Sequence, residues 1–150
     1  WLGAGLPLAI GSDSHASRDA LEELRWLDYG QRLALRRRNV AAAPEAGIAS
    51  TAERLFGLAV ASGAGAAGEP AWGFVAGARA DALVVDTEAP SLLGIAPERL
   101  VDALVFSSPA SPWRDVLVGG RWVIQARRHP AQHRIAGNFE AAMRQLWRSA

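Results

Sequence analysis

The arrangement of apolar and polar positions begins with a continuous apolar run, Leu6–Ile10, that leads into the polar sequence Gly11-Ser12-Asp13-Ser14-His15. A short apolar run without alternating polar residues is typical of a strand buried on both faces, as in a parallel sheet. We therefore predict a buried strand followed by a loop at its carboxyl end. In α/β proteins, loops at this end of the strands bind ligands.

A helix is predicted next, over about Arg18–Arg38. Leu21, Leu24 and Leu27 recur there at helical spacing and form one apolar side. Ser17 is a suitable N-cap residue, acidic side chains follow it in the first turns, and arginines gather at the other end. This charge order complements the helix dipole and supports the prediction.

A second helix is predicted after the capping box formed by Ser50 and Glu53. It is expected to end near Ser62, because the stretch 62–70 is dominated by glycine and alanine. The part Gly63-Ala-Gly65-Ala-Ala-Gly68 fits the dinucleotide-binding pattern Gly-x-Gly-x-x-Gly. That motif requires a strand before it and a helix after it, so we interpret these residues as a linker and domain boundary.

Beyond this boundary the pattern changes to short strand-like runs. Asp81–Val85 and Ala103–Phe106 are predicted strands. Val116–Val118 and Trp122–Ile124 flank Gly119-Gly120, where a positive φ angle is accessible, and this arrangement predicts a β-hairpin. A last amphipathic helix is predicted over about Gly137–Trp147.

Charge and composition narrow the classes of function. The 150 residues include 16 basic and 15 acidic side chains, giving a net charge of +1, which is too small a field to recruit nucleic acid or an anionic membrane. A small-molecule substrate is therefore expected. The chain has no cysteine, so a metal would need histidine or carboxylate ligands, and a reducing cytoplasm is a compatible location.

The ends of the sequence also affect its interpretation. It opens on Trp1 without an initiator Met and enters an apolar run within a few residues, so we expect a segment cut inside a domain. No apolar run approaches the roughly 18 to 20 residues that cross a bilayer, and no signal-peptide pattern is present.

Asp13 is the strongest candidate for chemistry on physical grounds. A carboxylate at the carboxyl end of a buried strand is positioned at the mouth of an α/β sheet or barrel, where it can reach a metal or a water molecule. The competing interpretation is a turn or cap residue. Ser14 and His15 are candidate pocket residues, although a histidine hydrogen-bonded locally in the loop would produce the same sequence.

Two further groups of residues have simpler interpretations. His129 and His133 have the spacing of paired zinc ligands on a helix, but Pro130 lies between them and no glutamate does. The run Arg36-Arg37-Arg38 falls where a helix C-terminus attracts cations. We interpret it as a solvated helix end or as one packed on a partner segment.

Two motifs together resemble the amidohydrolase superfamily. The span Gly73-x-x-x-Gly77-Ala-Arg-Ala-Asp81-Ala-Leu-Val-Val-Asp86, followed about 30 residues later by Val116-x-Val118-Gly-Gly-Arg121-x-Val123, is similar to the closing β-sandwich segment of that superfamily. The upstream Gly11-Ser12-Asp13-Ser14 resembles the end of its eighth barrel strand. Further motifs are similar to the formimidoylglutamate deiminase family within it: Glu22-Glu23-Leu24-Arg25-Trp26-Leu27, Tyr29-Gly30-Gln31-Arg32-Leu33 and Arg36-Arg37-Arg38-Asn39.

This resemblance implies an α/β fold: the C-terminal part of a (β/α)8 barrel with a segment of a small β-sandwich. It assigns residues 1–68 to the last barrel strand and helices, 69–128 to the sandwich segment, and 129–150 to a tail and helix. The implied reaction, in histidine degradation, is hydrolysis of N-formimidoyl-L-glutamate to N-formyl-L-glutamate and ammonia. One divalent ion, zinc or a similar metal, would have Asp13 among its ligands.

General chemistry explains why that reaction needs a carboxylate. A metal ion lowers the pKa of its bound water from about 16 towards 7, and a carboxylate beside both can move the proton of that water to the departing nitrogen. The resemblance gives Asp13 this catalytic role. The chain lacks a His-x-His pair, so the remaining ligands would lie outside it, and these 150 residues should be inactive alone.

Other hypotheses stay open at this point. Another deaminase or a chlorohydrolase of the same superfamily would share the barrel-end aspartate and the sandwich. A noncatalytic β-rich interaction module, with Asp13 as a helix-entry residue, belongs to a different class. The sequence leaves open whether the full-length protein forms homo-oligomers.

Overall fold

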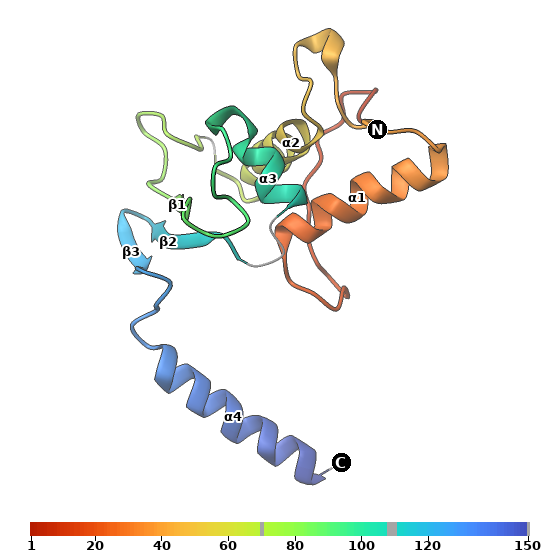
Figure 1. Cartoon of the computed structure of the whole chain (residues 1–150). Coiled ribbons are helices and arrows are strands. Elements are labelled where there is room, and N and C mark those ends of the chain that lie inside the picture. Colours follow the sequence, from red (N-terminus) through yellow and green to blue (C-terminus); the bar gives the residue numbers. More distant parts are fainter. Residues whose placement is uncertain (70, 108–110, 150) are drawn as a thin grey trace. The chain divides into compact units, whose positions relative to one another are not determined.

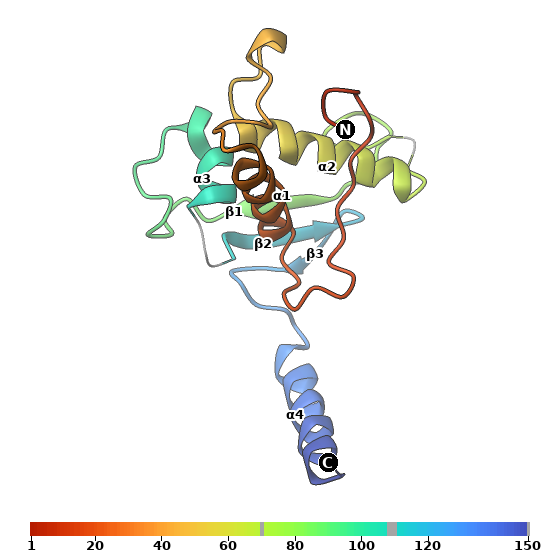
Figure 2. The same cartoon turned by 90° about the vertical axis from the view of Figure 1, so that its right-hand side faces the viewer.

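The computed structural model describes residues 1–69, 71–107 and 111–149 of the chain. They form two compact units, one helical and one built on a small sheet (Figures 1 and 2). The presence of helices and a sheet confirms the predicted α/β class. The helical unit comprises Trp1–Ala78 and Asp86–Pro112, and the sheet unit comprises Arg79–Val85 and Trp113–Ala150.

The first predicted helix is confirmed as α1, Ala20–Leu35, and is shorter at both ends than expected. Ser17 was wrongly predicted as its cap. Asp19 is the N-cap, because its extended backbone places the carboxylate 2.9 Å from the amide nitrogen of Leu21. At the other end Arg36 adopts a left-handed conformation, with φ at 53°, which ends the helix.

The second helix, α2, spans Thr51–Ala66 and begins at the predicted capping box. The Ser50 hydroxyl accepts a hydrogen bond of 3.0 Å from the amide of Glu53. The prediction that this helix ends near Ser62 is wrong, since its backbone hydrogen bonds continue through the alanines and glycines that follow. The Gly63 to Gly68 stretch therefore lies at the end of a helix, which excludes the geometry of a dinucleotide-binding loop.

The predicted strand over Ala103–Phe106 is also wrong, because these residues belong to helix α3, Leu100–Phe106. A short 3-10 turn, η2 (Pro97–Arg99), leads into it. Ala103, Leu104 and Val105 are all buried, with α1 and α2 both in contact with α3. A short helix covered on several sides is apolar at consecutive positions and cannot be told from a buried strand by spacing alone.

The core of the helical unit lies between α1, α2 and α3. Leu24, Leu55 and Val105 are its largest fully buried side chains. The Arg25 guanidinium crosses from α1 to donate a 2.8 Å hydrogen bond to the carbonyl of Val105. Arg54 donates to three carbonyls, those of Ala41, Ala42 and Leu2, and so joins α2 to two loops. The other buried apolar residues come from the three helices and from the loops beside them: Leu21, Ala41, Ala43, Ala52, Ala59, Ala64, Leu92, Ala103 and Leu104.

The predicted opening strand is not formed, since residues 6–12 have no regular secondary structure. A strand exists only when its backbone pairs with a neighbour, and no other described segment pairs with this run. Its backbone is instead tied to α2, where the amide of Leu8 donates to the Ser62 hydroxyl at 2.9 Å.

The sheet unit contains β1 (Ala82–Val85), β2 (Trp113–Val118) and β3 (Arg121–Ile124), antiparallel and in that order. The predicted strand at 81–85 and the predicted hairpin are both confirmed. Gly119 and Gly120 form the turn with φ angles of 56° and 76°. The carboxylate of Asp81 accepts a 2.6 Å hydrogen bond from the Gly119 amide and so joins the start of β1 to this turn.

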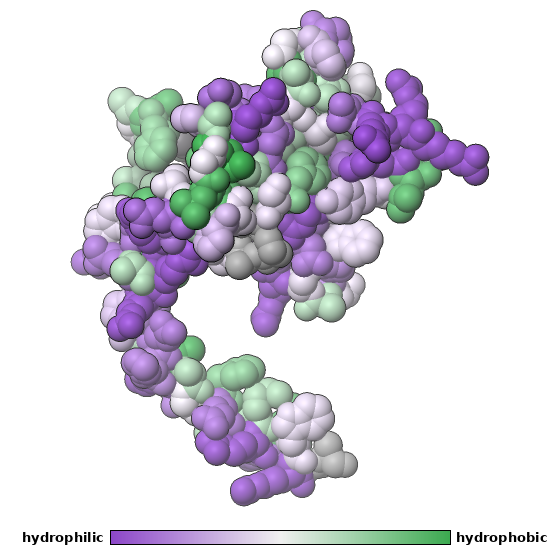
Figure 3. Space-filling model, in the orientation of Figure 1, coloured by the Kyte–Doolittle hydropathy of each residue, from purple (hydrophilic) through white to green (hydrophobic). Residues whose placement is uncertain are grey.

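Helix α4, Gln132–Ser149, confirms the predicted tail helix and extends it at both ends. Within its own unit, the backbone of α4 does not pack against β1, β2 or β3, and only Gln132 and His133 at its start border a hollow shared with Trp122 and Val123 of β3. Its apolar side chains gather along one side (Figure 3) and are largely exposed: Ile135, Phe139, Leu146 and Trp147. None of the helices in the described part of the chain has the length and apolar character needed to span a membrane.

Candidate functional site around Asp13

Asp13 lies in a tight turn immediately after the apolar segment. Its φ angle is 38°, a left-handed value that aspartate tolerates better than most residues. The amide of His15 closes the turn on the carbonyl of Ser12 at 2.6 Å. The carboxylate of Asp13 is exposed and accepts no hydrogen bond from the described residues, so it is not engaged as a cap.

The other two predicted site residues differ in their surroundings. Ser14 is exposed, and its side chain makes no hydrogen bond in the described part of the chain. His15 turns toward α1, where its Nδ1 atom lies 3.0 Å from the Ser17 hydroxyl and 3.2 Å from Glu23 Oε1. Its ring meets that of Trp26 edge-on, with centroids 6.3 Å apart. The structure thus holds His15 by local contacts to α1, the alternative that the sequence left open.

Glu23 and Trp26 are residues of this neighbourhood that the sequence analysis missed. They project from α1, whereas His15 lies on the loop before it, so their meeting depends on how the loop folds back. Helical spacing links residues within α1 but carries no signal for a contact between a helix and an irregular loop. Both residues also line a groove of about 460 Å³ together with the segment 6–11.

The described residues do not make a metal centre by themselves. No group of three or more His, Cys, Asp or Glu side chains converges anywhere in residues 1–69, 71–107 and 111–149. Protein zinc sites use three or four protein ligands, and Asp13 supplies one. His129 precedes α4, and its Nδ1 accepts from the Ala131 amide at 3.1 Å, so it does not share a helix face with His133.

A buried carboxylate on α1 was not anticipated. Asp28 is 3% exposed, its Oδ2 atom lies 3.6 Å from Arg32 Nη1, and its Oδ1 atom has no hydrogen-bond partner. Burial raises the pKa of Asp28 above the ordinary value of 3.8, and the nearby Arg32 only partly opposes this effect. The carboxyl group of Asp28 is therefore harder to ionise in the folded chain than in the unfolded chain.

We predict that Asp28→Asn stabilises the chain at neutral pH. Because the pKa is raised in the folded state, the contribution of Asp28 to stability is fully present below its unfolded-state pKa of 3.8 and is lost as pH rises through the folded-state pKa. The asparagine variant has no such loss of stability as pH rises. Urea unfolding of both proteins at several pH values would measure the difference in their free energies of unfolding. A variant less stable than the wild type at pH 7 would mean that the Arg32 contact outweighs desolvation.

Comparison with known proteins gives two close similarities. No protein-family model matches the chain. Formimidoylglutamate deiminase from Pseudomonas aeruginosa is 39% identical over 146 residues, which are 97% of this chain and 32% of that protein. A crystal structure of an amidohydrolase from Brucella melitensis matches with a TM-score of 0.84 and 35% identity, over 97% of this chain and 31% of that one.

The chain thus spans about a third of the length of the relatives it matches. Both are hydrolytic enzymes by name, as expected from the sequence motifs. The match covers the turn that carries Asp13 as well as both structural units, since nearly all of the chain is included. Over almost its whole length, this chain is similar to part of a formimidoylglutamate deiminase and to part of an amidohydrolase of known structure.

Proposed function

We propose that the chain is part of an enzyme that hydrolyses N-formimidoyl-L-glutamate to N-formyl-L-glutamate and ammonia. The observation that carries the proposal is the 39% identity to a formimidoylglutamate deiminase over 97% of the chain. The runner-up is another deaminase or chlorohydrolase of the amidohydrolase superfamily, which the structural match alone would equally support. A noncatalytic interaction module loses its support because both relatives are named as enzymes.

The proposed architecture is the end of a (β/α)8 barrel followed by part of a β-sandwich. The segment 6–12 would complete a barrel strand once neighbouring strands are available, with α1 as the helix after it. The antiparallel strands β1, β2 and β3 would belong to the sandwich. The parts 1–68, 69–128 and 129–150 remain our proposed division.

Asp13 would carry the proton transfer of the reaction. Water adds its oxygen to the formimidoyl carbon, the double bond from that carbon to the terminal nitrogen is broken in two steps, and both protons of the water reach that nitrogen, which leaves as ammonia. A carboxylate within hydrogen-bond reach of both atoms can accept each proton from the water oxygen and pass it to the nitrogen. The exposed carboxylate of Asp13, which accepts no hydrogen bond from the residues that the structure describes, is suited to this role, and Ser14 and His15 are its proposed pocket neighbours.

A divalent ion, zinc by our proposal, would be held mainly by residues outside this chain, since the described residues offer Asp13 alone. The test is a steady-state assay of the full-length protein against N-formimidoyl-L-glutamate. We expect ammonia release that a strong chelator abolishes and added metal restores. The 150-residue chain, assayed as a control, should be inactive and bind zinc weakly.

Two outcomes would contradict this proposal. Turnover of a nucleobase or a chlorinated ring, without turnover of the formimidoyl substrate, would favour the runner-up. Measurable deiminase activity from the 150-residue chain alone would show that the active site does not depend on residues outside it.

A further inference from the structure

The turn that carries Asp13 has few restraints of its own. Asp13 has a φ angle of 38°, and the turn is closed by one backbone hydrogen bond of 2.6 Å, from the amide of His15 to the carbonyl of Ser12. The side chains of Asp13 and Ser14 make no hydrogen bond in the described part of the chain. The direction of the Asp13 carboxylate therefore depends on what holds the residues on either side of it.

His15 joins this turn to α1. Its Nδ1 atom lies 3.0 Å from the Ser17 hydroxyl and 3.2 Å from Glu23 Oε1, and its ring meets that of Trp26 edge-on. Ser17 belongs to the same loop as His15, whereas Glu23 and Trp26 belong to the helix. The attachment of the turn to α1 therefore runs through Glu23 and Trp26.

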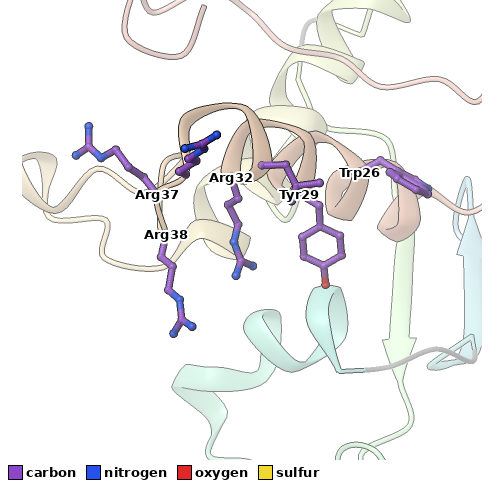
Figure 4. Close-up of a pocket in the computed structure, with 7 residues that line it drawn as sticks. Trp26, Tyr29, Arg32, Arg37 and Arg38 are labelled. Carbon is purple, nitrogen blue, oxygen red and sulfur yellow. The ribbon is translucent and has the colours of Figure 1, made fainter.

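Trp26 gives this attachment little rigidity. It is 57% exposed and borders a hollow of about 680 Å³, at the end of α1 away from Arg37 and Arg38 (Figure 4). The centroids of the Trp26 and His15 rings are 6.3 Å apart, near the long end of the range of about 4.5 to 7 Å for aromatic pairs. The contact with Glu23 is therefore the closer restraint on His15.

Glu23 has an unused hydrogen-bond acceptor at this contact. Its Oε1 atom is buried and has no hydrogen-bond partner among the described residues, although His15 Nδ1 is 3.2 Å away. A carboxylate oxygen can only accept, so a proton on His15 Nδ1 satisfies it after a small rotation of the ring. Because a buried acceptor without a donor is unfavourable, Glu23 favours the ring orientation that directs Nδ1 toward α1.

Glu23 also borders the chain on the other side of Asp13. It lines a groove of about 460 Å³ together with Ile10 and Gly11, which precede the turn. One side chain of α1 thus lies beside the segment that enters the turn and beside the histidine that leaves it.

We propose that Glu23 is a positioning residue for the proton transfer assigned to Asp13, and that it acts through His15. It restrains the turn, so that the Asp13 carboxylate stays within hydrogen-bond reach of the water and of the departing nitrogen. A displacement of about 1 Å at a reacting group can cost about a hundredfold in rate. This inference rests on the proposed function of the full-length enzyme.

The experiment is steady-state kinetics of the full-length protein with N-formimidoyl-L-glutamate. Glu23→Ala should lower kcat about 10- to 100-fold and change KM by about threefold or less, because it displaces the reacting carboxylate and removes no contact to the substrate. Glu23→Gln should recover most of the lost kcat, since its amide oxygen also accepts a hydrogen bond from His15 Nδ1. The matched control is Glu53→Ala, which removes an exposed acidic side chain from the first turn of α2 and should leave kcat unchanged.

His15→Ala distinguishes an effect through His15 from a direct one. In a protein that already lacks this imidazole, Glu23→Ala should lower kcat no further, because the two residues act in series. Independent effects that multiply in the double variant would overturn the proposal, as would a Glu23→Ala protein with the kcat of the wild type.

Hydrogen exchange gives a readout that needs no turnover. Deuterium uptake by the peptide spanning residues 11–18 should rise in the Glu23→Ala protein, while uptake across α2 stays at the wild-type level. Equal increases in both segments would mean a general loss of stability and would overturn the proposal. A wild-type protein that does not hydrolyse N-formimidoyl-L-glutamate would refute the proposed function, and the exchange data would still decide whether Glu23 restrains the turn.

Discussion

Replacing Asp13 by asparagine in the full-length protein should lower kcat for N-formimidoyl-L-glutamate by about three powers of ten. The substitution keeps the size of the side chain but removes the carboxylate that would accept and return the proton. It should leave the fold intact, because the carboxylate makes no hydrogen bond to the described residues and asparagine also tolerates a φ angle of 38°. Steady-state kinetics and circular dichroism would measure the two effects.

The matched control is Glu45→Gln, which removes an exposed carboxylate from the short 3-10 turn η1 (Pro44–Ala46) in the same unit. Its turnover should equal that of the wild type. Near-normal kcat in the Asp13→Asn protein would rule out the proposed role of this residue. An unfolded Asp13→Asn protein would show instead that the turn depends on the carboxylate.

Leu55→Ala should destabilise the helical unit by about 3 kcal/mol, which is a large part of the stability of a small domain. Leu55 projects from α2 into the core and is 0% exposed, so truncation removes buried apolar surface and leaves a cavity. Chemical denaturation followed by tryptophan fluorescence would give the change in free energy of unfolding.

Leu93→Ala is the corresponding control, since the same atoms are removed from a residue that is 63% exposed in the same unit. We expect a change within about 0.5 kcal/mol. Equal effects of the two substitutions would mean that Leu55 does not contribute to the core as its burial indicates.

Features controlled by neighbouring residues in the chain could be predicted well. The Ser50 cap forms as expected, because the Ser50 hydroxyl and the Glu53 amide that donates to it are three residues apart. The hairpin at Gly119-Gly120 follows from two residues with positive φ between two apolar runs. In each case the interaction lies within a few residues, and the sequence pattern contains all of it.

Features that depend on distant partners were predicted wrongly or not at all. Residues 103–106 form a helix because α1 and α2 cover them, and the segment 6–12 forms no strand because no described segment pairs with it. The contacts of His15 with Glu23 and Trp26 depend on the path of the loop between them.

The sequence by itself therefore determined the main helices, the hairpin, the resemblance to amidohydrolases and the choice of Asp13 as the candidate catalytic residue. These follow from local hydrogen bonding, side-chain spacing and short motifs. The tertiary structure decided that no described residue donates to the Asp13 carboxylate, that His15 is held by α1, and that Asp28 is buried. Burial and contact between distant residues are properties of the packed chain, and no local pattern specifies which side chains will meet.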